Sequence, residues 1–291
     1  MTLLLAVPNV SQGRDQGSIA AIGGAFEASG ARLLDLHVDP DHNRSVYTLA
    51  GRPGELAHAL TEGARETAKR VDMTRHTGVH PCVGALDVVP VVHLDDARRG
   101  AAVAEALVAA DEIARAIEAP VFLYGALGQA RTRAQLREGG AKALAKRLES
   151  GEQRPDFGPA RLHPTAGAVL VAARPPLVAF NVLLGPEASL EDARAIAARV
   201  REGGPEGLPG LRAIGLWLAH ERAAQVSCNV ERPSELPLGR VVEAVRRHAP
   251  VVAAELVGLA PEAALAGFPA DVPLPGFDPD RHILERLLHY A

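Results

Sequence analysis

Apolar and polar positions alternate along the first 124 residues in a pattern typical of short strands and amphipathic helices. A buried strand is predicted at residues 3–7, and residues 32–37 and 45–50 also have strand character. Ile19, Ile22 and Phe26 recur at helical spacing before Gly30, which predicts a helix that ends there. With a helix at about 53–71 and a strand at 85–92, the order is β-α-β-β-α-β.

The same order recurs in the second half of the chain. After an additional helix (95–117) and strand (120–124), strands are predicted at 177–184, 213–219, 223–230 and 251–257, with helices at 190–201 and 236–247. This is the split β-α-β order of ferredoxin-like sheets. The predicted fold class is therefore α/β (α+β), with two similar ferredoxin-like subdomains and a ligand cleft between them. The expected boundaries are 1–178 and 179–291, beside Pro175-Pro176.

Two segments lie outside the repeat. Residues 125–162 are rich in Arg, Gly and Pro and are expected to form one helix flanked by irregular loops. The proline-rich tail from residue 260 is expected to be a loop followed by one terminal helix at about 280–289.

Composition narrows the classes of function. Hydrophobic residues make up 47% of the 291, enough for a sizeable core, and the formal net charge is −4. No long block of one charge sign occurs, which argues against a nucleic-acid partner. No apolar run reaches the length of about 18 residues that a membrane span needs. With only two cysteines, no disulfide framework is expected, and the chain is predicted to be cytoplasmic.

The segment 75–87 carries the most unusual chemistry in the sequence. His76 and His80 stand four residues apart in a loop broken by Gly78 and Pro81, directly before a strand. Histidine titrates nearest neutrality and suits proton removal from a nitrogen nucleophile. From spacing alone, a catalytic role and an ordinary turn position both stay open. A metal site was considered for five histidines and is the minor alternative, because Gly78 and Pro81 disfavour the helix that would align a pair. These histidines are His37, His42, His76, His80 and His93.

Two further loops are dense in polar or glycine residues. Residues 39–44 form a predicted hairpin turn in which Arg44 could instead grip a carboxylate through two hydrogen bonds. Residues 155–167 form a loop punctuated by glycine and proline that leads into an apolar strand. Glycines there allow either close approach to a flat ligand or an ordinary tight connection.

Taken together, these motifs resemble the formiminotransferase domain of formiminotransferase-cyclodeaminase and its free-standing bacterial relatives. The matching segments follow in order over nearly the whole chain: residues 7–13, 43–47, 76–81, 84–90, 123–125, 155–159, 179–181, 224–229 and 255–259. The resemblance implies two α/β subdomains, a homodimer, and glutamate formimidoyltransferase activity in histidine degradation, a part of one-carbon metabolism. It also implies small-molecule substrates, with tetrahydrofolate as co-substrate and no metal.

Site residues follow from the same resemblance. The family's catalytic histidine precedes the proline, which matches His80. The family's folate-contacting loop matches ten consecutive residues: Gly158, Pro159, Ala160, Arg161, Leu162, His163, Pro164, Thr165, Ala166 and Gly167. Four polar residues are further candidates for holding substrate: Asn43, Arg44, Arg174 and Asn181.

The chain also departs from the family pattern. Cys82 stands where the bifunctional enzymes have arginine, and Ala166 stands where they have tryptophan. The family's threonine-glycine-alanine-arginine run becomes residues 171–174 (VAAR). Two alternatives therefore stay open beside formimino transfer from N-formimino-L-glutamate to tetrahydrofolate. One is formyl transfer between 5-formyltetrahydrofolate and glutamate, and the other is a non-catalytic folate-binding paralogue.

Overall fold

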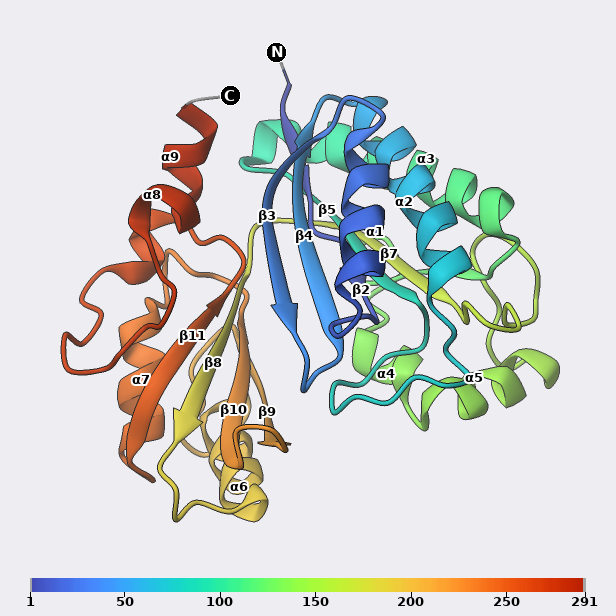
Figure 1. Cartoon of the computed structure of the whole chain (residues 1–291). Coiled ribbons are helices and arrows are strands. Elements are labelled where there is room, and N and C mark those ends of the chain that lie inside the picture. Colours follow the sequence, from blue (N-terminus) through green and yellow to red (C-terminus); the bar gives the residue numbers. More distant parts are fainter. Residues whose placement is uncertain (1, 290–291) are drawn as a thin grey trace. The chain divides into compact units, whose positions relative to one another are not determined.

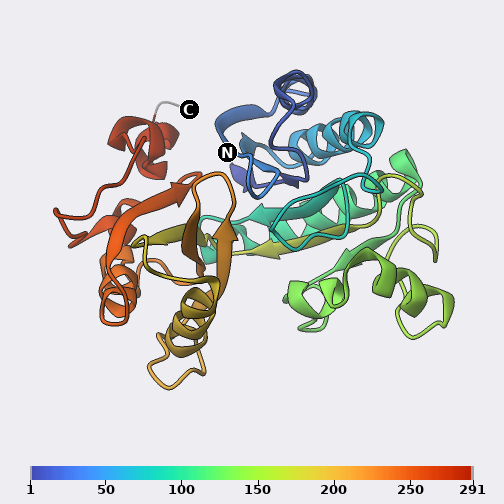
Figure 2. The same ribbon diagram turned by 60° about the horizontal axis from the view of Figure 1, so that its bottom comes forward.

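The computed structural model describes residues 2–289 and divides the chain into two compact units, Met1–Pro175 and Pro176–Ala291. Each unit has its own sheet and its own hydrophobic core (Figures 1 and 2). Within the described residues, every helix is too short or too polar to cross a lipid bilayer.

The first unit is built on a seven-stranded mixed sheet. Its strands are β1 (Leu4–Ala6), β2 (Asn9–Val10), β3 (Arg32–Asp39), β4 (Arg44–Gly51), β5 (Leu86–Val92), β6 (Val121–Leu123) and β7 (Val169–Arg174). The short β1 and β2 lie between β4 and β5, and β3 forms the edge beside β4. This is the split β-α-β arrangement that the sequence predicts, extended by parallel pairing of β5 with β7 and of β7 with β6.

Helices cover both faces of this sheet. Helices α1 (Gln16–Glu27), α2 (Glu55–Arg70) and α3 (Arg99–Ile117) pack on one face, where Val89 and Val91 of β5 point. Helices α4 (Arg133–Arg137) and α5 (Gly140–Glu149) lie on the other face (Figure 2). Their buried leucines share a core cluster with Val88. Because β5 is covered on both faces, it is buried along its whole length, which explains its continuous apolar sequence.

Helix ends in this unit are fixed by side chains. Asp15 caps α1 by accepting a 3.0 Å hydrogen bond from the amide of Gly17. Helix α2 has no cap of its own, but the buried carboxylate of Glu105 on α3 accepts hydrogen bonds from the amides of Gly54 and Ala57. Thus α3 packs against α2 and also provides hydrogen-bond acceptors for the unpaired amides at the start of α2.

The second unit repeats the pattern with a four-stranded antiparallel sheet in the order β11-β8-β10-β9. Its strands are β8 (Val178–Leu184), β9 (Leu211–Leu218), β10 (Ala223–Val230) and β11 (Val251–Val257). Helices α6 (Leu190–Val200) and α7 (Leu238–Arg246) share one core with this sheet, which includes Phe180 and Cys228. The predicted fold class, α/β with two ferredoxin-like subdomains, is thereby confirmed.

Two local predictions are wrong. Residues 125–162 contain two helices, α4 and α5, because Gly139 and Gly140 both adopt positive φ and end the first. The expected single terminal helix is divided into α8 (Pro279–His282) and α9 (Leu284–His289), since Ile283 between them is extended. A short 3₁₀ helix (Glu262–Leu265) precedes them.

Two helical glycines provide a test of packing between α1 and α2. A Cβ on Gly63 of α2 would lie 2.0 Å from the buried ring of Phe26 on α1, whereas nothing lies within 4 Å of one on Gly24 of α1. We expect Gly63→Ala to lower the free energy of unfolding by about 1–3 kcal/mol through overpacking. Gly24→Ala should raise it by roughly 0.5–1 kcal/mol, because alanine favours the helix. Urea denaturation measures both, and a stabilised Gly63→Ala protein would contradict this packing.

Candidate functional site

Three loops of the first unit meet at one end of its sheet, and the side chain of Asn43 connects them. The amide of Gly13, after β2, donates a 2.9 Å hydrogen bond to Oδ1 of Asn43 in the β3–β4 turn. Nδ2 of Asn43 donates to the carbonyl of Thr77 at 3.0 Å and lies 3.3 Å from Nδ1 of His76, in the loop before β5. Asn43 is therefore a junction between segments that are distant in sequence.

The close approach of these loops requires small residues at two places. A Cβ on Gly13 would lie 2.2 Å from the carbonyl oxygen of Asp39, and one on Gly78 would lie 2.4 Å from that of His42. Asn43 itself has a φ of 48°, in the left-handed region that asparagine tolerates better than most residues. The glycines and the asparagine thus have a structural reason to be where they are.

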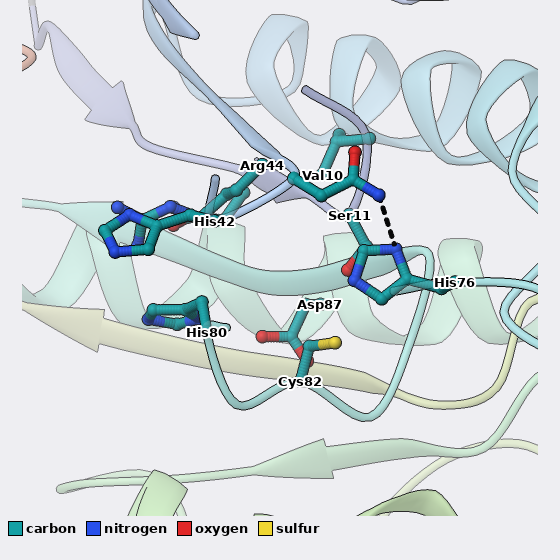
Figure 3. A pocket seen from close by; sticks show the side chains of 10 residues that line it. Val10, Ser11, His42, Arg44, His76, His80, Cys82 and Asp87 are labelled. Carbon is teal, nitrogen blue, oxygen red and sulfur yellow. Dashed lines mark hydrogen bonds between the residues drawn. The ribbon is translucent and has the colours of Figure 1, made fainter. Parts of the chain in front are cut away.

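A small pocket lies among these loops (Figure 3). Its lining joins the end of β2, the β3–β4 turn, the loop before β5 and the start of β5: Asn9, Val10, Ser11, His42, Asn43, Arg44, His76, His80, Cys82 and Asp87. In Figure 3 the rings of His42 and His80 lie on one side and that of His76 on the other. The structure therefore brings together three of the predicted site residues, namely His80, Asn43 and Arg44.

His80 has an unusual electrostatic environment. Desolvation and the positive charges of Arg44, Arg137, His42 and Arg133 lower the pKa of its imidazole well below the usual value of 6.5. Both causes act in the same direction, because each disfavours the charged ring. His80 is consequently neutral at pH 7 and able to accept a proton.

A buried ion pair supports the loop that carries His80. One carboxylate oxygen of Asp87, at the start of β5, accepts a 2.7 Å hydrogen bond from the amide of Val83. The other pairs with the guanidinium of Arg137 on α4, and both side chains are largely buried. The sequence analysis assigns no role to either residue. Asp87 could have been noticed, because it is a charged residue inside the apolar run at 85–92.

Cys82, next to this ion pair, is not prepared to act as a nucleophile. Burial and the negative charge of Asp87 raise the pKa of its thiol above the usual 9.0. The thiol is therefore protonated near neutral pH, and the thiolate is the reactive form.

The loop predicted to contact folate lies directly beside the segment that follows His80. The amide of Ala85 donates to the carbonyl of Ala166, and the amide of Ala168 donates to that of Val83. His163 closes the loop on itself, because its Nδ1 accepts a 2.8 Å hydrogen bond from the amide of Ala166. The loop and the pocket thus share a backbone framework.

Individual residues of this loop differ in exposure. Ala166 is only 3% exposed and packs in the core, so its methyl group faces the interior. Gly167 is buried, and a Cβ there would lie 2.2 Å from the carbonyl of Val83. Four residues are exposed and form the outer surface of the loop: Gly158, Ala160, Arg161 and Pro164.

Arg174 and Asn181 do not line the pocket. Arg174 pairs with Val92 at the far end of β5, roughly 13 Å along the sheet from the level of Val88 at about 3.3 Å per residue. Its Nη1 donates to the carbonyl of Pro175. Asn181 lies on β8 of the second unit, is 2% exposed, and donates a 2.7 Å hydrogen bond to Glu255 on β11.

No group of three or more His, Cys, Asp or Glu side chains with metal-binding geometry occurs among residues 2–289. The histidines considered for a metal site are distributed differently. His42, His76 and His80 share the pocket, whereas His93 bonds to the carbonyl of Asp95 at the opposite end of β5.

Comparison with known families agrees with this architecture. Residues 3–174 match the family described as "Formiminotransferase domain, N-terminal subdomain", and residues 179–268 match "Formiminotransferase domain". The chain belongs to the formiminotransferase family. The two matched segments correspond to the two sheets, which confirms the resemblance recognised in the sequence motifs.

Individual relatives are of two lengths. The chain is 37% identical to the formimidoyltransferase-cyclodeaminase of Mus musculus over 281 residues, which cover 90% of this chain but 51% of that protein. It spans about half the length of the first curated relatives it matches. It is also 35% identical to the glutamate formimidoyltransferase of Streptococcus pyogenes, covering 89% of each chain. The glutamate formimidoyltransferase of Thermoplasma acidophilum is 32% identical and is covered over 99% of its length.

The junction at Asn43 can be tested by substitution. Asn43→Gly keeps the positive φ but removes the side chain that links the three loops. We expect the free energy of unfolding to fall by about 2 kcal/mol, since two buried hydrogen bonds and a histidine contact are lost. Gln129, exposed and also at positive φ, provides the control variant Gln129→Gly. Urea denaturation showing equal effects for both variants would contradict the assigned role.

Proposed function

We propose that this formiminotransferase chain transfers a formimino group from N-formimino-L-glutamate to tetrahydrofolate, with His80 as the general base. The observation that carries the proposal is the position of His80 in a small pocket beside Arg44, with the charges of Arg137 and Arg133 also acting on its ring and lowering its pKa. The activity named for the full-length relatives of similar size supports the same reaction.

The reaction needs a proton acceptor near the attacking amine. A secondary amine of the reduced pterin forms a bond to the amidine carbon and loses its proton. The bond from that carbon to the glutamate nitrogen breaks, and this nitrogen keeps the electron pair and gains a proton. A histidine kept neutral can accept that proton, and general base catalysis typically contributes about 10²–10⁴-fold. Holding both substrates on one framework supplies further acceleration by positioning. The adjacency of the 158–167 loop to residues 83–85 supports a folate position near His80.

Positive charge around the pocket suits an anionic donor. Arg44 lines the pocket, and Arg133 and Arg137 act electrostatically on His80. Guanidinium groups bind carboxylates through paired, charge-assisted hydrogen bonds, and both glutamate and folate carry carboxylates. Of the four anchoring candidates, Arg44 and Asn43 are those we retain for this pocket. The homodimer and the cytoplasmic location stay predictions that rest on the sequence.

The role of His80 predicts a specific kinetic change. His80→Gln should lower kcat by about 10²-fold or more, with folate binding and thermal midpoint nearly unchanged, because glutamine retains bulk but cannot act as a base. His76→Gln should have a much smaller effect. The assay measures transfer to tetrahydrofolate from N-formimino-L-glutamate and, in parallel, from 5-formyltetrahydrofolate to glutamate. Substantial activity in the His80 variant would contradict the mechanism, and turnover only in the formyl assay would reassign the donor.

The lowered pKa of His80 determines the pH profile. A general base works in its neutral form, so the base function should be lost as the pH falls through the pKa of His80, well below 6.5. The acidic limb of the wild-type profile therefore lies below pH 6.5 and should be absent from the residual activity of His80→Gln.

Arg44 should act mainly on donor affinity. Arg44→Lys keeps the charge but loses the planar fork, and we expect KM for the donor to rise about tenfold, as for the loss of one charge-assisted hydrogen bond. Steady-state kinetics with each substrate varied in turn measures this. A lowered thermal midpoint with unchanged KM would show that Arg44 stabilises its own turn instead.

A further inference from the structure

A second histidine of the pocket is held by a carboxylate. Asp39 ends β3, and His42 follows three residues later in the β3–β4 turn. Oδ1 of Asp39 accepts a 2.8 Å hydrogen bond from the amide of His42, and Oδ2 lies 2.6 Å from Nδ1 of its ring. One carboxylate therefore fixes both the backbone and the imidazole of His42.

This contact determines the state of each ring nitrogen. Burial opposes ionisation of Asp39, but the hydrogen bonds and charge of His42, together with Arg44, lower its pKa to about 2. An ionised carboxylate can only accept hydrogen bonds, and its Oδ2 at 2.6 Å favours a hydrogen on Nδ1, although neither ring nitrogen of His42 meets hydrogen-bond geometry with a described group. Nε2 is the atom left for chemistry. It is buried and makes no hydrogen bond to any of residues 2–289, and His42, which is only 1% exposed, lines the pocket.

His42 and His80 are neighbours that cannot both be positively charged without cost. Their ring centroids are 5.8 Å apart in an edge-on arrangement, and positive charge on His42 disfavours a proton on His80. The two rings also have different charged neighbours. Asp39 lies against His42, whereas Arg44, Arg137 and Arg133 act on His80.

We propose that His42, oriented by Asp39, is the general acid that protonates the departing glutamate nitrogen. This rests on the proposed function. The lone pair of the pterin amine forms the new bond to the formimino carbon while His80 takes the amine proton. The bond between that carbon and the glutamate nitrogen breaks, its electron pair goes to nitrogen, and Nε2–H of His42 supplies the proton. His80 gains one proton and His42 loses one. Proton exchange with solvent then returns both residues to their starting protonation states.

A change of leaving group distinguishes an acid from a residue that merely positions substrate. N-Formimino-4,4-difluoro-L-glutamate keeps both carboxylates, but its fluorines make the departing nitrogen less basic and less dependent on protonation. With N-formimino-L-glutamate, we expect His42→Gln to lower kcat about 10²-fold. With the difluoro donor the loss should shrink to a few-fold. His80→Gln should lose about the same factor with both donors, because its base role does not depend on the leaving group.

Two further variants complete the experiment. Asp39→Asn keeps an acceptor for the amide of His42 but removes the negative charge, so it should show the same donor dependence in weaker form. If His42→Gln does not fold, Asp39→Asn carries the comparison. His93→Gln is the matched control, because His93 is also buried (6% exposed, against 1% for His42) but lies outside the pocket, and the kcat of this variant should equal that of the wild type.

The outcomes separate this inference from the proposed function. A His42→Gln variant with wild-type kcat, or with equal losses for both donors, would overturn the acid role while leaving transfer itself intact. A wild-type protein that transfers nothing from either donor to tetrahydrofolate would overturn the proposed function and this inference with it.

Discussion

The candidate site depends on one side chain at the junction of three loops. Asn43 accepts from Gly13 and donates to Thr77, while its backbone occupies the left-handed region. Around it, Gly13 and Gly78 leave no room for a Cβ, so the loops meet backbone to backbone. The rings of His42 and His80 owe their fixed separation to this contact, because both belong to segments that it joins.

The charged groups around the pocket give neighbouring side chains different electrostatic environments. Asp87 pairs with Arg137 beneath the loop, and Asp39 pairs with His42 at its rim. The carboxylates are thus occupied by partners, whereas His80 experiences mostly positive neighbours and desolvation. The two histidines therefore have different electrostatic surroundings, although they line the same pocket.

Much of the fold could be predicted from the sequence, since burial of one face of a strand or helix imposes a regular spacing of apolar residues. The alternation in residues 45–50, the apolar run at 85–92 and the helical spacing of Ile19, Ile22 and Phe26 all correspond to observed elements. The break between α4 and α5 was missed because a Gly-Gly pair permits several backbone conformations, and its effect depends on packing.

The site was only partly predictable, because some of its contacts join residues that are far apart in the sequence. His80, Asn43 and Arg44 stand out in their motifs, and all three line the pocket. The Asp87–Arg137 ion pair joins residues 50 positions apart, and no local pattern reveals such a contact. Arg174 lies outside this pocket, because strand register pairs it with Val92 at the other end of β5.

The assembly of the pocket from β2, the β3–β4 turn and the start of β5 has a consequence for how the protein folds. The short β2 pairs with β4 on one side and with β5 on the other, so the pocket is complete only when β5 is in place. A partly folded chain with α1, β3 and β4 formed would hold His42 but lack His80. A nascent chain emerging from the ribosome therefore cannot complete this pocket until the residues of β5 have been synthesised.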